Sequence, residues 1–184
     1  PVPPGFSWAF SGNEKERIDS FLLLMQAAVL GMILVYMVMA SQFESLLAPF
    51  IIFLSIPFGF MGAIQLLAIT GNRISVVSLL GFIILIGIVV NNGIVLISYI
   101  NMLIRRGIKL SPALIAAGKS RLRPVVSTSC TTAIGMLPMA LSTGDGSEVW
   151  VPIGLTVIGG LFVSTIMTLV LMPILYSLLQ HWLV

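Results

Sequence analysis

The sequence predicts an all-α integral membrane protein that crosses the bilayer with five helices. Hydrophobic residues make up 58% of the chain, charged residues make up 8%, and the mean hydropathy is +1.14. A soluble globular domain carries about 25% charged residues. The apolar residues also fall into windows of about 20, which is the length that a helix needs to cross a bilayer.

Five apolar windows separated by polar connectors define the predicted spans. They cover about 21–40, 47–69, 76–103, 124–141 and 151–179. Residues 41–44 (SQFE) fit a capping box ahead of the second span. Pro57, Pro138 and Pro173 are expected to kink the spans that contain them. A short helix over about 111–120 starts at a Ser-Pro pair and is expected to lie at the cytoplasmic interface.

The distribution of basic residues predicts the orientation. Six of the nine Lys and Arg residues fall within 104–123, whereas the connector 143–150 carries two acids and no base. Basic loops lie preferentially on the cytoplasmic side, so 104–123 is predicted to be cytoplasmic. Five crossings then place the N-terminus in the periplasm and the C-terminus in the cytoplasm.

The N-terminal segment differs from the rest of the chain. Phe6, Trp8 and Phe10 alternate with small residues, a pattern typical of a half-buried strand. We expect residues 1–12 to be the last strand of an extramembrane domain, 13–20 a charged lead-in, and 21–184 the transmembrane portion. No signal-peptide pattern precedes the strand, and the chain is expected to be a piece of a longer protein.

Two adjacent asparagines, Asn91 and Asn92, lie in the middle of the third span, within an apolar run over 75–103. Carboxamides at this depth are costly unless they have partners. In one interpretation they hydrogen-bond to a neighbouring helix and only stabilise packing. In the other, one of them faces a polar proton relay. Consecutive helical residues point about 100° apart, so both cannot face the same partner equally.

Arg121 and Thr128 form a second polar feature, on the fourth span. They are seven residues apart and therefore share one face of a helix. In one interpretation Arg121 and Arg123 are cytoplasmic anchors that extend toward the lipid headgroups, and the hydroxyl groups that follow bond to carbonyls of their own helix. In the other, Arg121 lies at the inner mouth of a proton path and Thr128 lies one or two turns deeper.

The predicted spans contain no acidic residue, because all six Asp and Glu residues fall in connectors or at span ends. A proton relay in a membrane usually needs a carboxylate or a histidine, so another segment would have to complete it. No glycine loop with a phosphate-binding lysine occurs, so ATP use is not expected. The sequence also predicts no cofactor, no bound metal and no nucleic-acid partner.

Several stretches, in order, resemble resistance–nodulation–division (RND) multidrug exporters of the hydrophobe/amphiphile efflux type. Residues 3–12 resemble the last strand of the family's porter domain, and 34–59, which includes SQFESLLAPF, resembles the helix pair that follows it. GIVVNNGIVLISYIN (87–101), 121–141 and 146–176 are similar to the tenth, eleventh and twelfth helices. The resemblance implies a C-terminal fragment that covers the eighth to twelfth helices.

The resemblance also implies a function for the intact protein. Such exporters are not enzymes but secondary active transporters of the bacterial inner membrane, and they exchange protons for hydrophobic or amphiphilic compounds. They are homotrimers that work with a periplasmic adaptor and an outer-membrane channel. The partners expected for this chain are therefore the rest of the same transporter, the lipid bilayer and those two proteins.

Three residues match positions of the family's proton relay. Arg121 matches the relay arginine, Thr128 the relay threonine and Asn91 the relay lysine, while Asn92 is a possible accessory residue. The aspartates that they serve lie on the family's fourth helix, which this chain does not contain. Asn91 departs from the pattern, because asparagine donates two hydrogen bonds but supplies no charge.

Two other interpretations stay open. The chain could be a truncated or orphan membrane module with a structural or assembly role and no transport of its own. It could also belong to an RND relative that exports metal ions, lipids or proteins, although SQFESLLAPF favours a drug exporter. The sequence upstream of Pro1 would separate the first of these interpretations from a pump.

Overall fold

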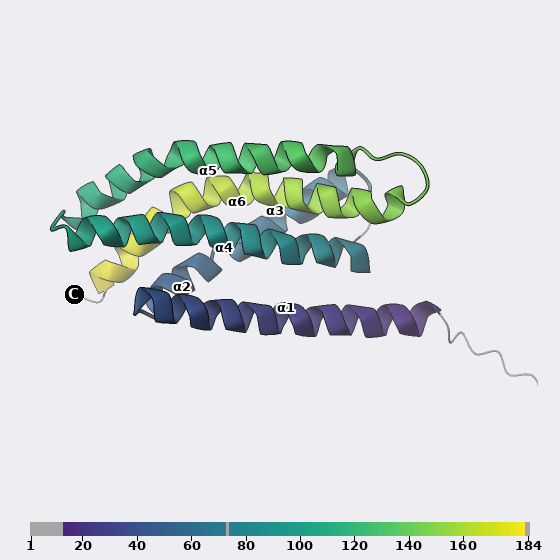
Figure 1. Ribbon diagram of the computed structural model, residues 1–184, viewed down its shortest axis with the longest axis horizontal. Coiled ribbons are helices and arrows are strands. Elements are labelled where there is room, and N and C mark those ends of the chain that lie inside the picture. The colour runs from purple at the N-terminus through teal and green to yellow at the C-terminus, as the bar shows by residue number, and fades with distance from the viewer. Residues whose placement is uncertain (1–12, 73, 183–184) are drawn as a thin grey trace, which may run out of the picture.

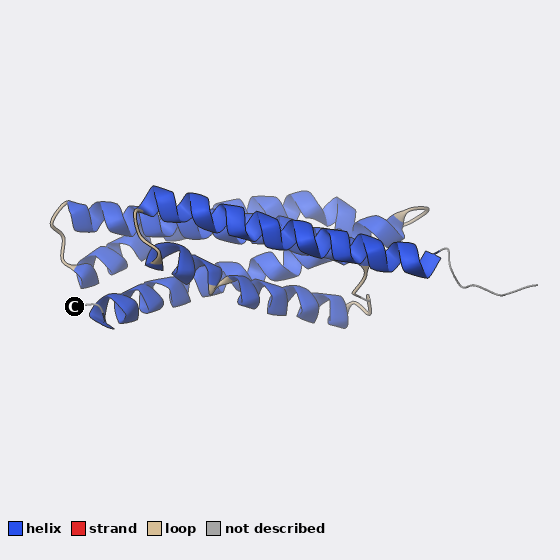
Figure 2. Cartoon of the chain, turned by 90° about the horizontal axis from the view of Figure 1, so that it is seen from below, coloured by secondary structure: helices blue, strands red, loops and turns tan. Residues whose placement is uncertain are grey.

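The computed structural model describes residues 13–72 and 74–182 and contains six helices (Figure 1). Figure 2 shows no strand in this part of the chain, and the all-α prediction is confirmed. The strand expected over 1–12 lies outside the described residues. The helices are α1 (Asn13–Phe43), α2 (Leu47–Phe53), α3 (Ile56–Ile69), α4 (Val76–Arg105), α5 (Leu110–Ala140) and α6 (Ser147–Trp182).

Within the described ranges, four segments are long and apolar enough to cross a membrane: Lys15–Phe43, Leu47–Ile69, Val76–Arg105 and Ser147–Leu178. The fourth expected span, 124–141, belongs to α5, whose 31 residues would extend roughly 46 Å. Hydroxyl and basic side chains make α5 less apolar than the others. The spans alternate in direction, so the α1–α2 turn, the basic α4–α5 loop and the end of α6 lie together on the left of Figure 1.

A break at Leu54 and Ser55 divides the second span into α2 and α3. Pro57 lies in the first turn of α3, where its missing N–H does not disrupt the helix. The Ser55 hydroxyl donates a 2.6 Å hydrogen bond to the Ile52 carbonyl, which also accepts from the Ser55 backbone N–H at 3.1 Å. The predicted kink at Pro57 is therefore a complete interruption, whereas Pro138 and Pro173 are accommodated inside α5 and α6.

The structure changes three local details of the prediction. The capping box over 41–44 is wrong, because α1 continues to Phe43 and α2 begins after Leu46, which provides no side-chain cap. The charged residues 13–20 form the first two turns of α1. The helix expected over 111–120 does form, but as the beginning of α5 rather than as a separate element, and Pro124 lies inside that continuous helix.

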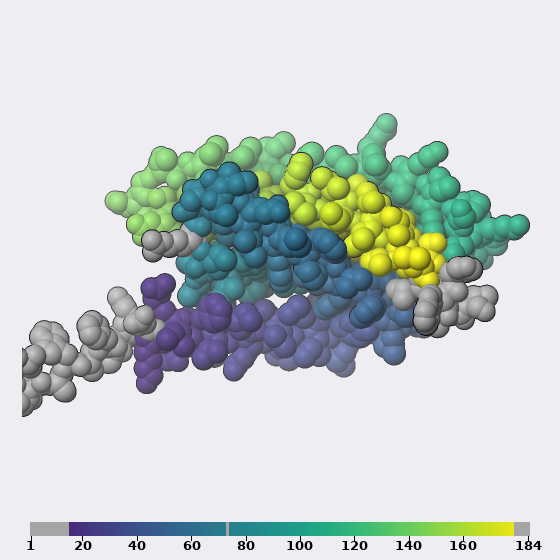
Figure 3. Space-filling view, turned by 180° about the vertical axis from the view of Figure 1, so that it is seen from behind, coloured from purple at the N-terminus to yellow at the C-terminus, as the bar shows by residue number. Residues whose placement is uncertain are grey.

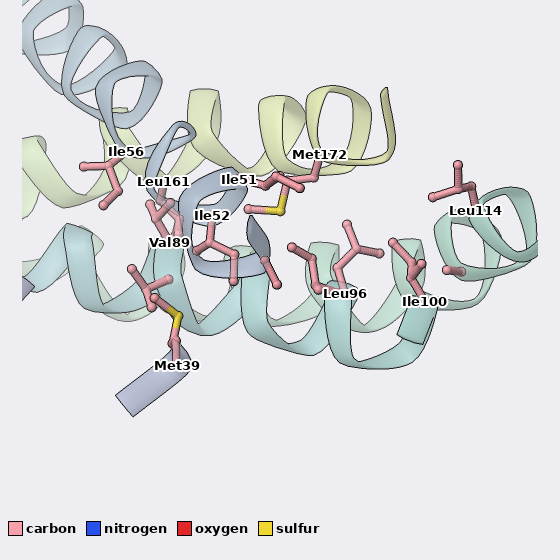
Figure 4. Close-up of a cluster of buried hydrophobic side chains, with 14 of the residues drawn as sticks. Met39, Ile51, Ile52, Ile56, Val89, Leu96, Ile100, Leu114, Leu161 and Met172 are labelled. Carbon is pink, nitrogen blue, oxygen red and sulfur yellow. The ribbon is translucent and has the colours of Figure 1, made fainter. Parts of the chain in front are cut away.

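Helix α6 is the centre of the bundle and packs against α3, α4 and α5. Small residues allow the close approach, as the glycine pattern indicates. A Cβ atom on Gly62 of α3 would lie 2.6 Å from the Gly159 carbonyl oxygen of α6, and one on Gly154 would lie 2.8 Å from the Ala140 nitrogen of α5. Figure 4 shows the adjacent apolar core, which includes Ile52, Leu96, Ile100, Leu161 and Met172.

Helix α1 lies along one edge of the molecule, as the space-filling view in Figure 3 shows. Its most apolar window has no buried residue, so most of its surface is available to lipid or to another protein segment. An apolar cavity of about 280 Å³ separates its first half from α3 and α4, with Phe60 and Phe82 in the wall. The compact part of the bundle therefore consists of α2 to α6.

Candidate functional site

The contact between Arg121 and Tyr99 shows how α5 is aligned against α4. The Arg121 guanidinium carbon lies 4.6 Å from the centre of the Tyr99 ring, and the two helices run antiparallel beside each other (Figure 1). Thr128 follows Arg121 by seven residues, and Asn92 precedes Tyr99 by seven. Each step is about 10 Å along a helix axis, so Thr128 is level with Asn91 and Asn92.

The two asparagines point in different directions, as their spacing predicts. Asn91 is exposed, whereas Asn92 is 6% exposed and lies inside the bundle. Neither carboxamide forms a hydrogen bond with the described residues, so the interhelical hydrogen bond of the packing interpretation does not occur among them. Asn91 borders a groove of about 370 Å³ between α1 and α4, whose other walls include Val38, Gln42 and Gly87.

Arg121 does not extend into solvent as a simple anchor. Its side chain is partly buried, and its Nε atom is buried without a hydrogen-bond partner in the described structure. The guanidinium instead lies over the Tyr99 ring, within the range of a cation–π interaction. Arg123, two residues later, is exposed and matches the anchor interpretation.

The three threonine hydroxyls of α5 bond to their own helix, as one interpretation of the sequence predicts. The Thr128 hydroxyl donates to the Pro124 carbonyl at 2.9 Å, and Thr131 and Thr132 repeat the pattern one turn later. Thr128 is nevertheless exposed on the bundle surface. Its oxygen retains lone pairs that can accept a hydrogen bond from a group outside this chain.

Sequence reasoning missed three polar contacts between helices. Tyr99 contacts Arg121, Ser129 shares a 2.7 Å hydrogen bond with Thr165 of α6, and the Tyr176 hydroxyl donates to Asn101 Oδ1 at 2.6 Å. None of these pairs is signalled by spacing within one helix. Each depends on the registers of α4 and α5 against α6, which the apolar core and the glycines determine.

The described bundle has fixed polar groups but no internal acid. All the acidic residues lie near helix ends or in turns, and no ion pair forms within the described ranges. These residues also contain no group of three or more His, Cys, Asp or Glu side chains that could hold a metal ion. Asn91 and Thr128 can donate or accept hydrogen bonds and Arg121 supplies positive charge, but none of the three carries a carboxyl or imidazole group.

Comparison with known proteins identifies the family to which this chain is similar. The sequence profile of the AcrB/AcrD/AcrF family matches residues 1–180. Swarming motility protein SwrC of Bacillus subtilis is 39% identical over 181 residues, which cover 98% of this chain and 17% of SwrC. Cobalt-zinc-cadmium resistance protein CzcA of Cupriavidus metallidurans is 36% identical over 178 residues, covering 96% and 17%. Multidrug resistance protein MdtC of Proteus mirabilis is 35% identical over 190 residues, covering 98% and 18%.

Solved structures show the same arrangement of helices. One crystal form of a heavy metal efflux pump superposes with a TM-score of 0.83 at 28% identity, over 95% of this chain and 18% of the pump. A second crystal form superposes with a TM-score of 0.68 at 36% identity, over 84% of this chain and 16% of the pump. The chain thus spans about a sixth of the length of the proteins that it matches, and its helices are arranged as in part of a larger pump.

Proposed function

The chain belongs to the AcrB/AcrD/AcrF family of RND efflux transporters, and from this membership we propose that it forms part of a proton-driven exporter. Family membership makes it an integral protein of the bacterial inner membrane, and the four long apolar segments agree with that location. Proton coupling, the substrate and the partners are proposals for the whole transporter, of which this chain is one portion.

One observation carries the proposal: Asn91 and Thr128 lie at the same depth, on surfaces of adjacent helices that this chain leaves exposed. A polar carboxamide at mid-bilayer depth requires a partner, and the described residues offer none. We propose that a helix from the rest of the transporter packs here and brings one or more carboxyl groups to this level.

Each residue then has a distinct role in the relay. When the carboxyl group is ionised, the Asn91 amide donates to it, and when it is protonated, the Asn91 carbonyl accepts from it. Thr128 presents an oxygen that already donates to Pro124 and so acts as an acceptor. Arg121, two turns toward the cytoplasm, supplies the local positive charge that favours ionisation. Asn92 faces inward and supports the packing around the site.

For the substrate, we propose hydrophobic or amphiphilic compounds, in line with the multidrug relative MdtC. Export of metal ions is the second candidate, because CzcA is equally similar and the two solved structures described above are of a heavy metal efflux pump. The proposed assembly is a homotrimer with a periplasmic adaptor and an outer-membrane channel. The other interpretations are an orphan module and an exporter of lipids or proteins. Neither predicts gradient-dependent efflux of a hydrophobic dye in the test below.

The test replaces Arg121 by Ala in the transporter that contains this chain, with Arg123→Ala as the matched control. Cells with equal amounts of each protein are loaded with a hydrophobic dye, and efflux is followed with and without a proton gradient. The proposal predicts gradient-dependent efflux that Arg121→Ala strongly reduces and Arg123→Ala retains. Unchanged efflux in both variants would remove Arg121 from the relay. Tolerance of zinc, cobalt and cadmium in the same cells separates the two substrate classes.

A further inference from the structure

The Tyr99 ring keeps Arg121 inside the α4–α5 interface. Arginine near the end of a membrane helix normally extends toward the headgroups, where its charge is solvated. Here the guanidinium carbon stays 4.6 Å from the ring centre, and Nε is buried without a partner. The two Nη nitrogens are not among the buried atoms that lack a hydrogen-bond partner.

Among the residues that the structure describes, no acidic group near Arg121 explains this position. On α4 and α6, the titratable residues toward this end of the bundle are Tyr99, Arg105 and Tyr176, and on α5 itself they are Lys119 and Arg123. Glu44, in the α1–α2 turn, is the sole acid of the cytoplasmic end, and it forms no ion pair with the described residues. His181 lies further along α6, outside the part whose side chains the structure describes. The aromatic face is therefore the feature that holds the guanidinium.

We propose that Tyr99 is a positioning residue, which holds the Arg121 guanidinium at the inner mouth of the proton relay and prevents it from extending into the headgroup region. This inference rests on the proposed function, because it assumes that carboxyl groups lie near Asn91. The ring face is the part that matters. Tyr99→Phe keeps that face, whereas Tyr99→Leu removes it and keeps an apolar side chain at the same position.

The inference predicts a direction for the pH dependence of transport. A nearby cation favours the ionised carboxyl group and lowers its pKa. If Tyr99 is replaced by Leu, Arg121 moves outward, its effect on the carboxyl group weakens, and the pKa of that group rises. The pH at which transport is half-maximal should therefore shift upward. Loss of the charge itself, in Arg121→Gln, should shift it in the same direction and further, by up to about one unit.

The experiment measures dye efflux against pH in vesicles that contain the intact transporter. It compares the unaltered protein with Tyr99→Phe, Tyr99→Leu and Arg121→Gln. A second measurement follows modification of Arg121 by phenylglyoxal, with Arg123 of the same molecule as the internal reference. We expect Tyr99→Leu to raise the modification rate of Arg121 relative to Arg123 several-fold, and Tyr99→Phe to leave it unchanged.

The outcomes separate the two proposals. An upward shift in Tyr99→Leu that is smaller than that in Arg121→Gln, together with no shift in Tyr99→Phe, supports the positioning role. A shift in Arg121→Gln combined with identical behaviour of the two Tyr99 variants overturns the positioning role and leaves the relay intact. The absence of any shift in Arg121→Gln overturns the relay role of Arg121 and the inference with it. Reduced efflux without a pH shift in Tyr99→Leu shows a structural role and also overturns the inference.

Discussion

Ser129 of α5 and Thr165 of α6 share a buried hydrogen bond, with 2.7 Å between their hydroxyl oxygens. Ser129 is 7% exposed and Thr165 is 6% exposed, so water competes little for this bond. The threonine hydroxyls of α5 bond to their own helix, whereas this pair joins two helices. The pair lies close to the level of Asn91 and Thr128, and so it helps to hold the α5 surface that bears the candidate site.

Removal of either hydroxyl from this pair should destabilise the bundle by about 1 kcal/mol, because the other is then buried without its partner. Ser129→Ala and Thr165→Val are the single variants, and both changes together complete a double-mutant cycle. The double variant should lose less stability than the sum of the singles. Unfolding in mixed micelles with increasing denaturing detergent measures the three losses. Additive losses would show that the two hydroxyls do not interact.

Thr168, one turn after Thr165, gives a contrasting prediction. Its Oγ1 atom is buried and has no hydrogen-bond partner in the described structure. Valine has nearly the same shape without the hydroxyl, so Thr168→Val should leave stability unchanged or raise it by up to about 1 kcal/mol. The same unfolding assay measures the change in stability. Thr165→Val, which should lose stability, is the reference. A clear loss of stability in Thr168→Val would mean that this hydroxyl has a bonding partner.

Gly62 should tolerate no side chain at the contact between α3 and α6. A Cβ atom there would lie 2.6 Å from both the Gly159 carbonyl oxygen and the Val163 side chain. Gly62→Ala should therefore cost about 1–3 kcal/mol through overpacking. Gly135→Ala is the matched control, since its Cβ meets nothing within 4 Å and alanine favours the helix. Equal effects of the two substitutions on thermal stability would show that α3 and α6 do not approach so closely.

Asn91 should matter for transport but not for folding of the bundle, because its side chain is exposed and forms no bond with the described residues. Asn91→Leu removes the donors for the carboxyl group and should reduce gradient-driven efflux about ten-fold or more. Asn91→Lys restores the residue that the family typically has and should retain efflux. Transport is measured as initial rate at equal protein amount. Full activity in Asn91→Leu would exclude this side chain from the relay.

The helices could be predicted from the sequence because length and apolarity define them. The predicted start is eight residues too late at α1, where charged residues extend the helix back to Asn13 beyond the apolar window. The break before Pro57 was anticipated only as a kink, because the bond from Ser55 to the Ile52 carbonyl is not visible in a hydropathy pattern. The continuity of α5 through Pro124 also needed the structure.

The candidate site was predictable within each helix but not between helices. The spacing of Arg121 and Thr128 placed them on one face, and the adjacency of Asn91 and Asn92 required them to diverge. The role of Tyr99 could not be predicted, because it depends on the register of α4 against α5. That register follows from packing on α6, through contacts such as the one between Gly81 and Thr156. Local spacing carries no information about such contacts.

The central claim is that a carboxyl group from another segment of the transporter lies opposite Asn91 and Thr128. An electron cryomicroscopy structure of the intact transporter tests it most directly, through the distance from the Asn91 carboxamide to the nearest carboxylate oxygen. We predict an Asp or Glu side chain within about 6 Å, close enough for hydrogen bonding or strong electrostatic coupling. A surface around Asn91 covered only by apolar side chains or lipid, with no acid within that distance, would contradict the account.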